Sequence, residues 1–348
     1  MTNTRLCRTF QTAPAGVPRD DSAKYLRSGL TTEGFQAPDW LVPDLEDGTA
    51  PDMKDEALDN VRDLLPEYAP GFAGEIWPRV EWAYDDEATR KRGEEQIRTL
   101  AESVGDHLDG VVVPKVGRLE DVQAAESVVA AASRETNRDL ELAVIVETAR
   151  ARSDLREIAK FGASSHLTAL VFGPVDYTAE LGGRELGESD TPLADNRPTW
   201  PGLYEALSNE ASASDLLAVG GPFDRLFRER AGVTFYNGDG YADHVVREAR
   251  VGLDGSWSLH PNQTAQANRI HLPTEDELRT AVRKIERFTE AKDTGTGAVA
   301  IDGQMVDEAT LKNFENTVAT VRAVHDARES QTTEYYDADL LDRALAVA

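Results

Sequence analysis

The sequence predicts an α/β protein, a (β/α)8 TIM barrel followed by a C-terminal helical extension. Short apolar runs alternate along the chain with helix-like patterns, which is typical of a parallel sheet. Eight such runs fall within roughly the first 270 residues, which matches the strand number and length of a closed barrel. We therefore expect the barrel at residues 1–270 and the extension at residues 271–348. A doubly wound open sheet is less favoured, because no Gly-x-Gly-x-x-Gly turn follows the first run.

The expected strands are apolar on both faces, as parallel strands buried between a core and covering helices are. In chain order they are Leu6–Thr12, Trp40–Glu46, Glu75–Val80, Leu108–Val116, Glu141–Thr148, Leu167–Asp176, Leu216–Phe223 and Gly255–Pro261. Between them, residues 121–129 and 153–160 have helical periodicity, and we expect Ser153 to cap the second of these helices.

The segment Leu181–Asn209 is rich in Gly, Pro, Asp and Thr and follows the sixth expected strand. In a barrel it would lie at the C-terminal face of the strands, where long loops often act as lids. A plain surface insertion explains the composition nearly as well, so both interpretations stay open.

The pattern changes after residue 262. Thr274–Thr294 predicts a long charged helix, Ala298–Ile301 a short strand, Asp302-Gly303 a turn, and residues 308 to about 328 another helix. Residues 329–348 are polar and then weakly helical. Because a barrel is complete without this region, we interpret it as an extension.

The chain of 348 residues has a formal net charge of −26, and most of its 37 basic residues are Arg. Acid spread along the whole chain is typical of a surface adapted to high salt, where self-repulsion is screened. An acidic protein of an ordinary cytosol is the alternative. In both cases the charge disfavours nucleic acid and anionic membranes as partners, because both bind positive patches.

Cys7 is the single cysteine, so no intrachain disulfide is expected and a reducing cytoplasm is the predicted location. We expect Cys7 to pack in the core rather than to act as a nucleophile. The N-terminus has no apolar signal region, and no stretch approaches the ~18 apolar residues of a membrane span.

Two acidic residues follow neighbouring apolar runs. Glu147 comes directly after Leu142–Val146, and Asp176 follows Leu167–Phe172 through a Gly-Pro turn. Since side chains at the carboxyl ends of barrel strands face the ligand site, both carboxylates are expected there. Two unpaired carboxylates are unfavourable in a buried site, and a shared Mg²⁺, which prefers oxygen ligands, is the simplest remedy. Helix caps or salt bridges at loop ends are the alternative.

Further polar residues stand at the ends of other expected strands. In chain order these are Asp44, Glu46, Asp47, Arg79, Lys115 and His260, and Pro261 follows the last of them. Acids, an arginine and a lysine converging on one mouth suit an anionic substrate held against a cation, and Arg79 would bind a carboxylate bidentately. A structural ion-pair network explains any single residue of the set, but explains the whole set less well.

Six short motifs occur in order within residues 5–325. They are residues 44–55, 113–116, 146–148, 172–176, 260–263 and 303–307. Together they resemble the citrate lyase β-subunit-like, or malyl-CoA lyase, family of the HpcH/HpaI aldolase superfamily. Arg8-Thr9-Phe10 and residues 75–80 are most similar to its salt-adapted branch, which contains L-malyl-CoA/β-methylmalyl-CoA lyases and a related malate synthase.

The resemblance implies that Glu147 and Asp176 bind Mg²⁺, with Mn²⁺ as a substitute, and that Arg79 holds the carboxylate or carbonyl oxygen of an oxo acid. It implies that Asp307 is the catalytic acid/base and reaches the site of a neighbouring subunit, because family extensions swap between protomers. The expected assembly is a homo-oligomer, a trimer or hexamer. Such a base benefits from partial desolvation that raises its pKa.

Coenzyme A would enter as part of the substrate and contact Phe10. Arg19 and Lys24 are weaker candidates for this contact, because their spacing differs from the family pattern. Asp44 and Asp47 would hold metal-bound waters or orient Arg79. The remaining residues expected around the substrate are Glu46, Lys115 and Pro261. Gly220 stands where the family has an Asp, so the role of that acid is vacant or displaced.

The implied reaction is a reversible Claisen-type cleavage of β-methylmalyl-CoA to propionyl-CoA and glyoxylate, and of malyl-CoA to acetyl-CoA and glyoxylate. A malate synthase that also hydrolyses the thioester is the first alternative, but the short distance from the eighth strand to Asp307 favours the lyase. A citrate-lyase-like subunit that is inactive alone is the second. A non-catalytic acidic surface protein is disfavoured by the ordered strand ends.

Overall fold

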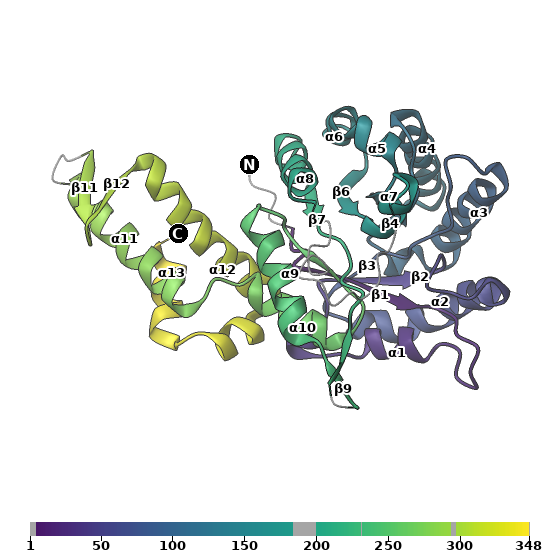
Figure 1. Ribbon diagram of the computed structural model, residues 1–348, viewed down its shortest axis with the longest axis horizontal. Coiled ribbons are helices and arrows are strands. Elements are labelled where there is room, and N and C mark those ends of the chain that lie inside the picture. The colour runs from purple at the N-terminus through teal and green to yellow at the C-terminus, as the bar shows by residue number, and fades with distance from the viewer. Residues whose placement is uncertain (1–4, 184–199, 231, 294–296, 348) are drawn as a thin grey trace. The chain divides into compact units, whose positions relative to one another are not determined.

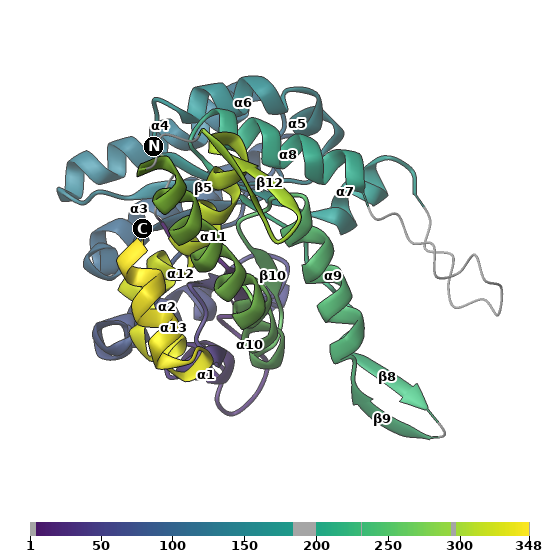
Figure 2. The same cartoon turned by 90° about the vertical axis from the view of Figure 1, so that its left-hand side faces the viewer.

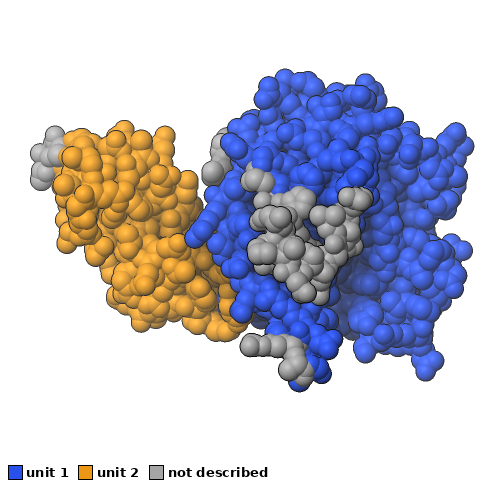
Figure 3. Space-filling view, viewed as in Figure 1, with its two compact units in different colours: residues 1–3, 7–267 blue, residues 4–6, 268–348 orange. Residues whose placement is uncertain are grey.

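The computed structural model describes residues 5–183, 200–230, 232–293 and 297–347 (Figure 1). The chain divides into two compact units (Figure 3). Residues 7–267 make up nearly all of the larger unit, and residues 4–6 and 268–348 form the smaller one. None of the helices in the described ranges is long and apolar enough to cross a membrane.

The larger unit contains the eight parallel strands that the sequence predicts. They are β1 (Thr9–Pro14), β2 (Trp40–Asp44), β3 (Glu75–Ile76), β4 (Gly110–Val113), β5 (Glu141–Val146), β6 (Leu167–Phe172), β7 (Leu217–Val219) and β10 (Ser256–Ser258). They pair in the orders β10-β1-β2-β3 and β4-β5-β6-β7, and every pair is parallel. Single parallel bridges from Arg79 to Val112 and from Val219 to Gly255 join the two groups at both edges. The ring therefore closes, which confirms the predicted barrel over the open sheet.

Apolar side chains fill the barrel interior. Along β5, Ala143 and Ile145 belong to this interior cluster, whereas the alternating residues Leu142, Val144 and Val146 pack with the covering helices. Both faces of the strand are thus buried, which explains its continuous apolar sequence.

Aromatic rings and the single cysteine also lie inside the barrel. Trp40 and Trp77 stack with their ring centroids 4.0 Å apart. Cys7 is buried in the same cluster, as expected of a cysteine that packs.

The helices lie mainly outside the ring of strands (Figure 1). They are α1 (Lys24–Leu30), α2 (Lys54–Tyr68), α3 (Glu87–Val104), α4 (Leu119–Thr136), α5 (Ala149–Ser153), α6 (Leu155–Gly162), α7 (Pro174–Glu180), α8 (Pro201–Ala213), α9 (Gly238–Arg250) and α10 (Pro261–Ile270). The helix expected at residues 121–129 is part of α4.

The predicted cap at Ser153 is wrong, because Ser153 is the last residue of α5. Thr148 caps α5 instead, since its hydroxyl accepts the N–H of Ala151 at 2.9 Å. Asp154 precedes α6 but does not cap it with its side chain. Its carboxylate accepts a hydrogen bond from Arg118 at 2.9 Å.

The predicted loop Leu181–Asn209 lies partly outside the described residues. Of the remainder, residues 201–209 belong to α8, so the prediction of irregular structure is wrong there. Pro201 opens α8, a position where its missing N–H is not needed. The sequence also failed to predict the antiparallel hairpin of β8 (Phe227–Arg230) and β9 (Val233–Tyr236), which extends from the start of α9 (Figure 2).

The smaller unit contains the elements expected of the extension. They are α11 (Glu275–Asp293), β11 (Ala298–Ile301), β12 (Gln304–Asp307), α12 (Glu308–Tyr335) and α13 (Ala338–Val347). β11 and β12 form a hairpin that turns at Asp302 and Gly303, both with positive φ. α12 kinks at Arg328, where the predicted helix ends, and continues beyond it.

Candidate functional site

The C-terminal ends of the barrel strands bring seven predicted residues together. They are Asp44, Glu46, Asp47, Arg79, Lys115, Glu147 and Asp176, and we call this cluster the barrel mouth. Glu147 directly follows β5 and is 3% exposed. Asp176 was expected at the end of a strand, but β6 ends at Phe172 and Asp176 lies in the first turn of α7.

Glu147 is a buried acid beside another acid. Its Oε1 accepts the backbone N–H of Lys115 at 2.7 Å. Burial, and then the negative charge of Asp176, raise the pKa of Glu147 from 4.5 to about 8. Both effects favour the neutral form, so a cation placed between the two carboxylates would relieve them.

The backbone around Glu147 is shaped to fit it closely. Lys115 has φ +47, a conformation that is strained for a residue with a long side chain, and its N–H points to Glu147. A Cβ at Gly173 would overlap Oε2 of Glu147, so only glycine fits there. The carboxylate is therefore held from two neighbouring strand ends.

Arg79 is clamped by Asp44. Its Nε and one terminal nitrogen donate to the two oxygens of Asp44 at 2.9 and 2.6 Å. Asp44 also accepts the N–H groups of Glu46 and Gly48, each at 2.9 Å. These four bonds use the acceptor positions of one carboxylate. Of the two roles expected of Asp44, orienting Arg79 is therefore favoured over holding metal-bound water.

The guanidinium of Arg79 keeps donors to spare. Its other terminal nitrogen lies 3.3 Å from Glu46, and its plane lies over the ring of Trp257 at 5.6 Å. Of its five N–H donors, two bond to Asp44 and Glu46 pairs with the group by charge, which leaves three donors without a hydrogen bond in the described part of the chain. Two parallel donors suit one carboxylate of a substrate.

Lys115, which follows β4, connects this strand end to the acids that follow β2. Its ammonium contacts Glu46 and lies 2.7 Å from Asp47. Burial raises the pKa of Glu46, although Arg79 and Lys115 oppose this. Burial acts in the same direction on Asp47, but hydrogen bonds from Lys115 and the neighbouring residue outweigh it and lower the pKa of that group.

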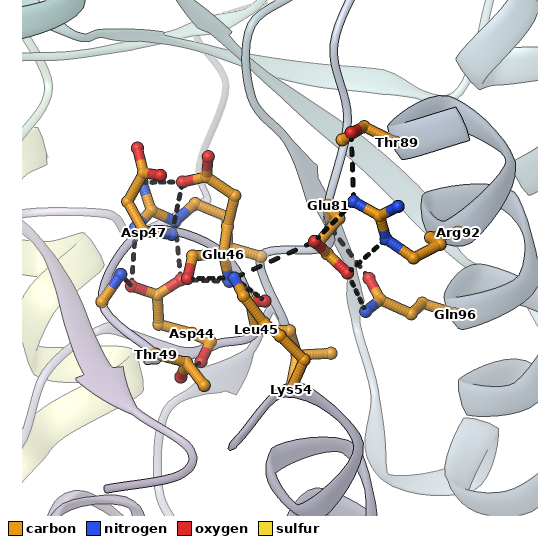
Figure 4. A network of polar contacts seen from close by, with 12 residues as sticks. Asp44, Leu45, Glu46, Asp47, Thr49, Lys54, Glu81, Thr89, Arg92 and Gln96 are labelled. Atoms are coloured by element: carbon orange, nitrogen blue, oxygen red, sulfur yellow. Dashed lines mark hydrogen bonds and ion pairs between the residues drawn. The ribbon is translucent and has the colours of Figure 1, made fainter. Parts of the chain in front are cut away.

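Behind the mouth, Lys54 holds the acidic segment in place (Figure 4). Its ammonium donates to the carbonyls of Leu45 and Glu46 at 2.9 and 2.5 Å and lies 4.0 Å from Glu81. Glu81 in turn accepts bonds from Arg92 and Gln96. The sequence analysis assigned no role to Lys54 or Glu81; a signal was available, because Lys54 lies within the acidic motif and Glu81 stands two residues after Arg79.

The donor set fits a hard cation with open positions. No group of three or more His, Cys, Asp or Glu side chains able to hold a metal occurs in the described ranges. Glu147 and Asp176 alone would provide two carboxylate oxygens, and Mg²⁺ commonly fills its remaining positions with water and substrate oxygens. Because the pair is destabilised by like charge and forms no three-ligand group in the part of the chain that the structure describes, it suits such a shared ion better than a closed structural site.

Asp307 belongs to the smaller unit and is exposed there. It caps α12, since its Oδ1 accepts the N–H and the hydroxyl of Thr310, both at 2.8 Å. These hydrogen bonds lower the pKa of Asp307. A raised pKa was expected of the catalytic base, so that expectation is wrong for this unit by itself.

The residues expected near coenzyme A differ in exposure. Phe10 is 0% exposed and packs edge-on against Trp257 inside the barrel, with ring centroids 5.0 Å apart. A ring without exposed surface cannot contact a coenzyme, so we withdraw Phe10 from that role. Arg19 and Lys24 are exposed after β1, and Arg19 lies over the ring of Tyr25 at 5.6 Å.

The residues after the eighth strand, His260 and Pro261, make no hydrogen bond or ion pair with the barrel mouth in the described residues. Pro261 is the first residue of α10, and His260 accepts the N–H of Asn262 at 3.1 Å. Burial lowers the pKa of His260, which favours a neutral ring. In the described residues, no hydrogen bond or ion pair connects Pro261 to the barrel mouth.

Comparison with known proteins shows which family the chain resembles. The sequence matches the HpcH/HpaI aldolase/citrate lyase family over residues 28–197. It is 64% identical over 345 residues to a Haloarcula marismortui protein named L-malyl-CoA/beta-methylmalyl-CoA lyase, covering 98% of this chain and 97% of that one. It is 33% identical to the malate synthase of Haloferax volcanii, covering 94% of this chain and 73% of the relative. A solved pyruvate/acetyl-CoA ternary complex of Haloferax volcanii malate synthase superposes with a TM-score of 0.69 at 30% identity, covering 99% of both chains.

Proposed function

The chain belongs to the HpcH/HpaI aldolase/citrate lyase family, and we propose that it is a Mg²⁺-dependent carbon–carbon lyase. Its substrates are β-methylmalyl-CoA, cleaved reversibly to propionyl-CoA and glyoxylate, and malyl-CoA, cleaved to acetyl-CoA and glyoxylate. The observation that carries this choice is the 64% identity, over almost the whole of both chains, to a relative with that name.

Glu147 and Asp176 would hold the cation, which supplies positive charge at the carboxylate and 2-oxygen of the substrate when bound. Mn²⁺ would substitute for Mg²⁺. Lys115 supports this arrangement in two ways. Its N–H fixes one oxygen of Glu147, and its ammonium balances the acids of the second strand end.

Arg79 would bind the glyoxylate part of the substrate with donors that Asp44 leaves free. The bidentate bond to Asp44 fixes the plane of the guanidinium, so those donors are oriented before the substrate arrives. A fixed positive group at the oxygens that change charge stabilises the transition state more than a mobile one.

Asp307 would move the proton at the α-carbon of the acyl-CoA. In the cleavage direction the 2-hydroxyl gives up its proton to solvent, its oxygen becomes the carbonyl of glyoxylate as the bond between the two substrate carbons breaks, and Asp307 would give one proton to the α-carbon of the CoA thioester enolate. In the condensation direction it removes the same proton. We assign this Asp307 to the smaller unit of a neighbouring subunit in a homo-oligomer, a trimer or hexamer.

The exposed environment of Asp307 supports the proposal of a swapped site. Helix-cap hydrogen bonds lower its pKa, which makes it a weak base for a thioester α-proton. Contact with another subunit would bury the carboxylate and raise its pKa. Arg19 and Lys24 would bind the phosphates of coenzyme A, because both are exposed cations after the first strand.

A malate synthase is the second candidate, since a synthase structure superposes over the whole chain. Sequence identity argues against it, because the chain is 64% identical to the Haloarcula lyase and 33% identical to the Haloferax synthase. The short connection from the eighth strand to Asp307 also favours the lyase.

The experiment is an assay of the purified chain with glyoxylate, propionyl-CoA and Mg²⁺ in concentrated KCl. High salt is chosen because the net charge is −26 and both named relatives come from haloarchaea. A new methylmalyl thioester without free CoA is the expected product. Free CoA released in step with loss of glyoxylate would support the synthase, and no reaction would support a subunit that needs partners. We also propose a cytoplasmic location.

A further inference from the structure

Glu248 is a fully buried acid that has no place in the mechanism above. It lies on α9, is 0% exposed, and is one helical turn from His244. Nε2 of His244 lies 3.0 Å from its Oε1, so the two form a buried ion pair when the ring is protonated. Burial alone would lower the pKa of His244, but the Glu248 carboxylate outweighs this and raises it. Buried ion pairs contribute little to stability, which calls for another reason to keep this one.

His244 and Glu248 both contact the backbone of the turn that follows β7. Gly220 and Gly221 directly follow β7, and the N–H of Gly221 donates to Oε1 of Glu248 at 3.1 Å. Nε2 of His244 lies 2.9 Å from the carbonyl oxygen of Gly221. Because both neighbours of Nε2 are acceptors, this nitrogen must carry the proton. The N–H and the C=O of a single residue are thus fixed by one helix.

The two glycines make this contact sterically feasible. A Cβ at Gly220 would overlap the carboxylate of Glu248, so the acid occupies the space that a side chain at position 220 would otherwise fill. The N–H of Gly220 also donates to the carbonyl of Gly255 at 2.9 Å, which joins the turn to the next strand position of the barrel. The turn therefore has little freedom to move.

The same turn lies against the segment that carries Asp176. A Cβ at Gly221 would be 2.6 Å from Cδ of Pro174 and 3.2 Å from the carbonyl oxygen of Phe172. Pro174 opens α7, and Asp176 follows two residues later in its first turn. A shift of the glycine turn would displace Pro174 and, with it, the carboxylate of Asp176.

We propose that His244 and Glu248 form a positioning pair that fixes Asp176 through the Gly220–Gly221 turn and Pro174. This inference rests on the proposed function, in which Asp176 is a metal ligand. Residues that orient a metal ligand typically change metal affinity ~10–100-fold when they are altered. The pair therefore sets the strength of metal binding although neither residue reaches the metal.

The test uses the full chain with Glu248→Ala and Glu248→Gln. Alanine removes both the charge and the acceptor of the Gly221 N–H, whereas glutamine keeps the shape and an acceptor if the alanine variant fails to fold. The matched control is Glu126→Gln, because Glu126 forms a similar His–Glu pair with His166, with its side chain 18% exposed and Nδ1 2.8 Å away. That pair precedes β6, at the opposite end of the barrel from the mouth.

The first readout is hydrogen exchange of the metal-free protein. We expect the amides of residues 175–180 to exchange about fivefold faster in the Glu248 variants, with unchanged exchange over α5 and α6 and no such change in the control. Unchanged exchange at residues 175–180 in both folded variants would overturn the inference, whatever the metal affinity of the wild type.

The second readout is the binding of Mn²⁺, followed by electron paramagnetic resonance of the free ion. We expect about tenfold weaker binding in the Glu248 variants and wild-type binding in Glu126→Gln. Wild-type affinity in both Glu248 variants would overturn the inference. If the wild type itself binds no Mn²⁺ while exchange is faster in the variants, the metal site of the proposed function fails and the positional link stands.

Discussion

The barrel mouth and the smaller unit hold their key carboxylates in opposite environments. Glu147 in the mouth is buried beside a second acid, and its pKa is raised to about 8. Asp307 in the smaller unit is exposed at a helix start, and hydrogen bonds from Thr310 lower its pKa. The proposed metal site thus has both of its carboxylates in one chain, whereas the proposed base lacks the desolvated surroundings that would raise its pKa.

This difference indicates which parts of the site one chain completes. Within one chain, the barrel mouth already contains the Arg79–Asp44 pair, the contact of the Lys115 ammonium with Asp47, and the backbone hydrogen bond to Glu147. The acid/base would become effective only when another surface covers it. Variants of the residues in the two environments test this contrast.

Asp307→Asn should lower kcat ~10²–10⁴-fold and leave KM nearly unchanged, because a positioned acid/base acts on the proton transfer and not on substrate binding. Steady-state rates of cleavage and condensation measure it. Asp302→Asn is the matched control, since Asp302 lies at the turn of the same hairpin and pairs with Arg283 on the surface. An Asp307→Asn enzyme with wild-type kcat would remove Asp307 from the mechanism.

Glu147→Gln should lower kcat/KM about 10³-fold, because a cation contributes several kcal/mol of charge stabilisation to such a transition state. The same change should raise Tm in the metal-free protein, since it removes a buried like-charge repulsion. Added Mg²⁺ should then stabilise the wild type and not the variant. Equal stabilisation of both by Mg²⁺ would place the cation elsewhere.

Arg79→Lys should lower kcat/KM ~10²-fold, because one ammonium cannot keep the bidentate bond to Asp44 and also offer two parallel donors. Arg8→Lys is the control, as Arg8 forms a similar buried bidentate pair with Asp39 outside the mouth. The control should lose stability in a thermal melt and keep its kinetic constants. An equal loss of kcat/KM in both variants would mean that Arg79 affects activity only by stabilising the folded protein.

The smallest effect concerns pH and the metal-free protein. The folded-state pKa of Glu147, about 8, lies above its ordinary 4.5, so this group favours folding most below about pH 4.5. That contribution declines as pH rises and is lost by about pH 8. The difference in Tm between Glu147→Gln and wild type should therefore widen by a few degrees from pH 5 to 8. Mg²⁺ binding should strengthen over the same range, because the metal needs the ionised acid.

A difference in Tm that does not change with pH would show that Glu147 titrates normally. Thermal melts of both proteins in concentrated KCl, with and without Mg²⁺, give all four curves. The same melts measured on Asp307→Asn test the other carboxylate. That change should leave the pH dependence of Tm above pH 5 unaltered.

The sequence predicts the barrel well, because its strands are buried on both faces and appear as continuous apolar runs. It fails at β8 and β9, whose exposed residues Phe227, Val233 and Phe235 form a hairpin without a buried face to set a pattern. It also misplaces the cap near Ser153, since two short helices meet there and a tertiary bond to Arg118 engages Asp154.

The site follows a similar rule. Strand-end acids and bases could be found from sequence, because topology carries every strand end to one face. The exclusion of Phe10 from the coenzyme site could not, since burial depends on the aromatic rings around it. The pairing of Glu248 with a glycine turn on another element was equally hidden, as only the fold brings the two together.

The most direct test of a site shared between chains is complementation of two inactive variants. Glu147→Gln and Asp307→Asn are mixed in equal amounts, dissociated in low salt and reassembled in concentrated KCl. If each site takes Glu147 from one chain and Asp307 from another, random reassembly should restore about a quarter of wild-type activity. No recovery, with oligomers of normal size formed, would contradict the account, because both residues would then have to come from the same chain.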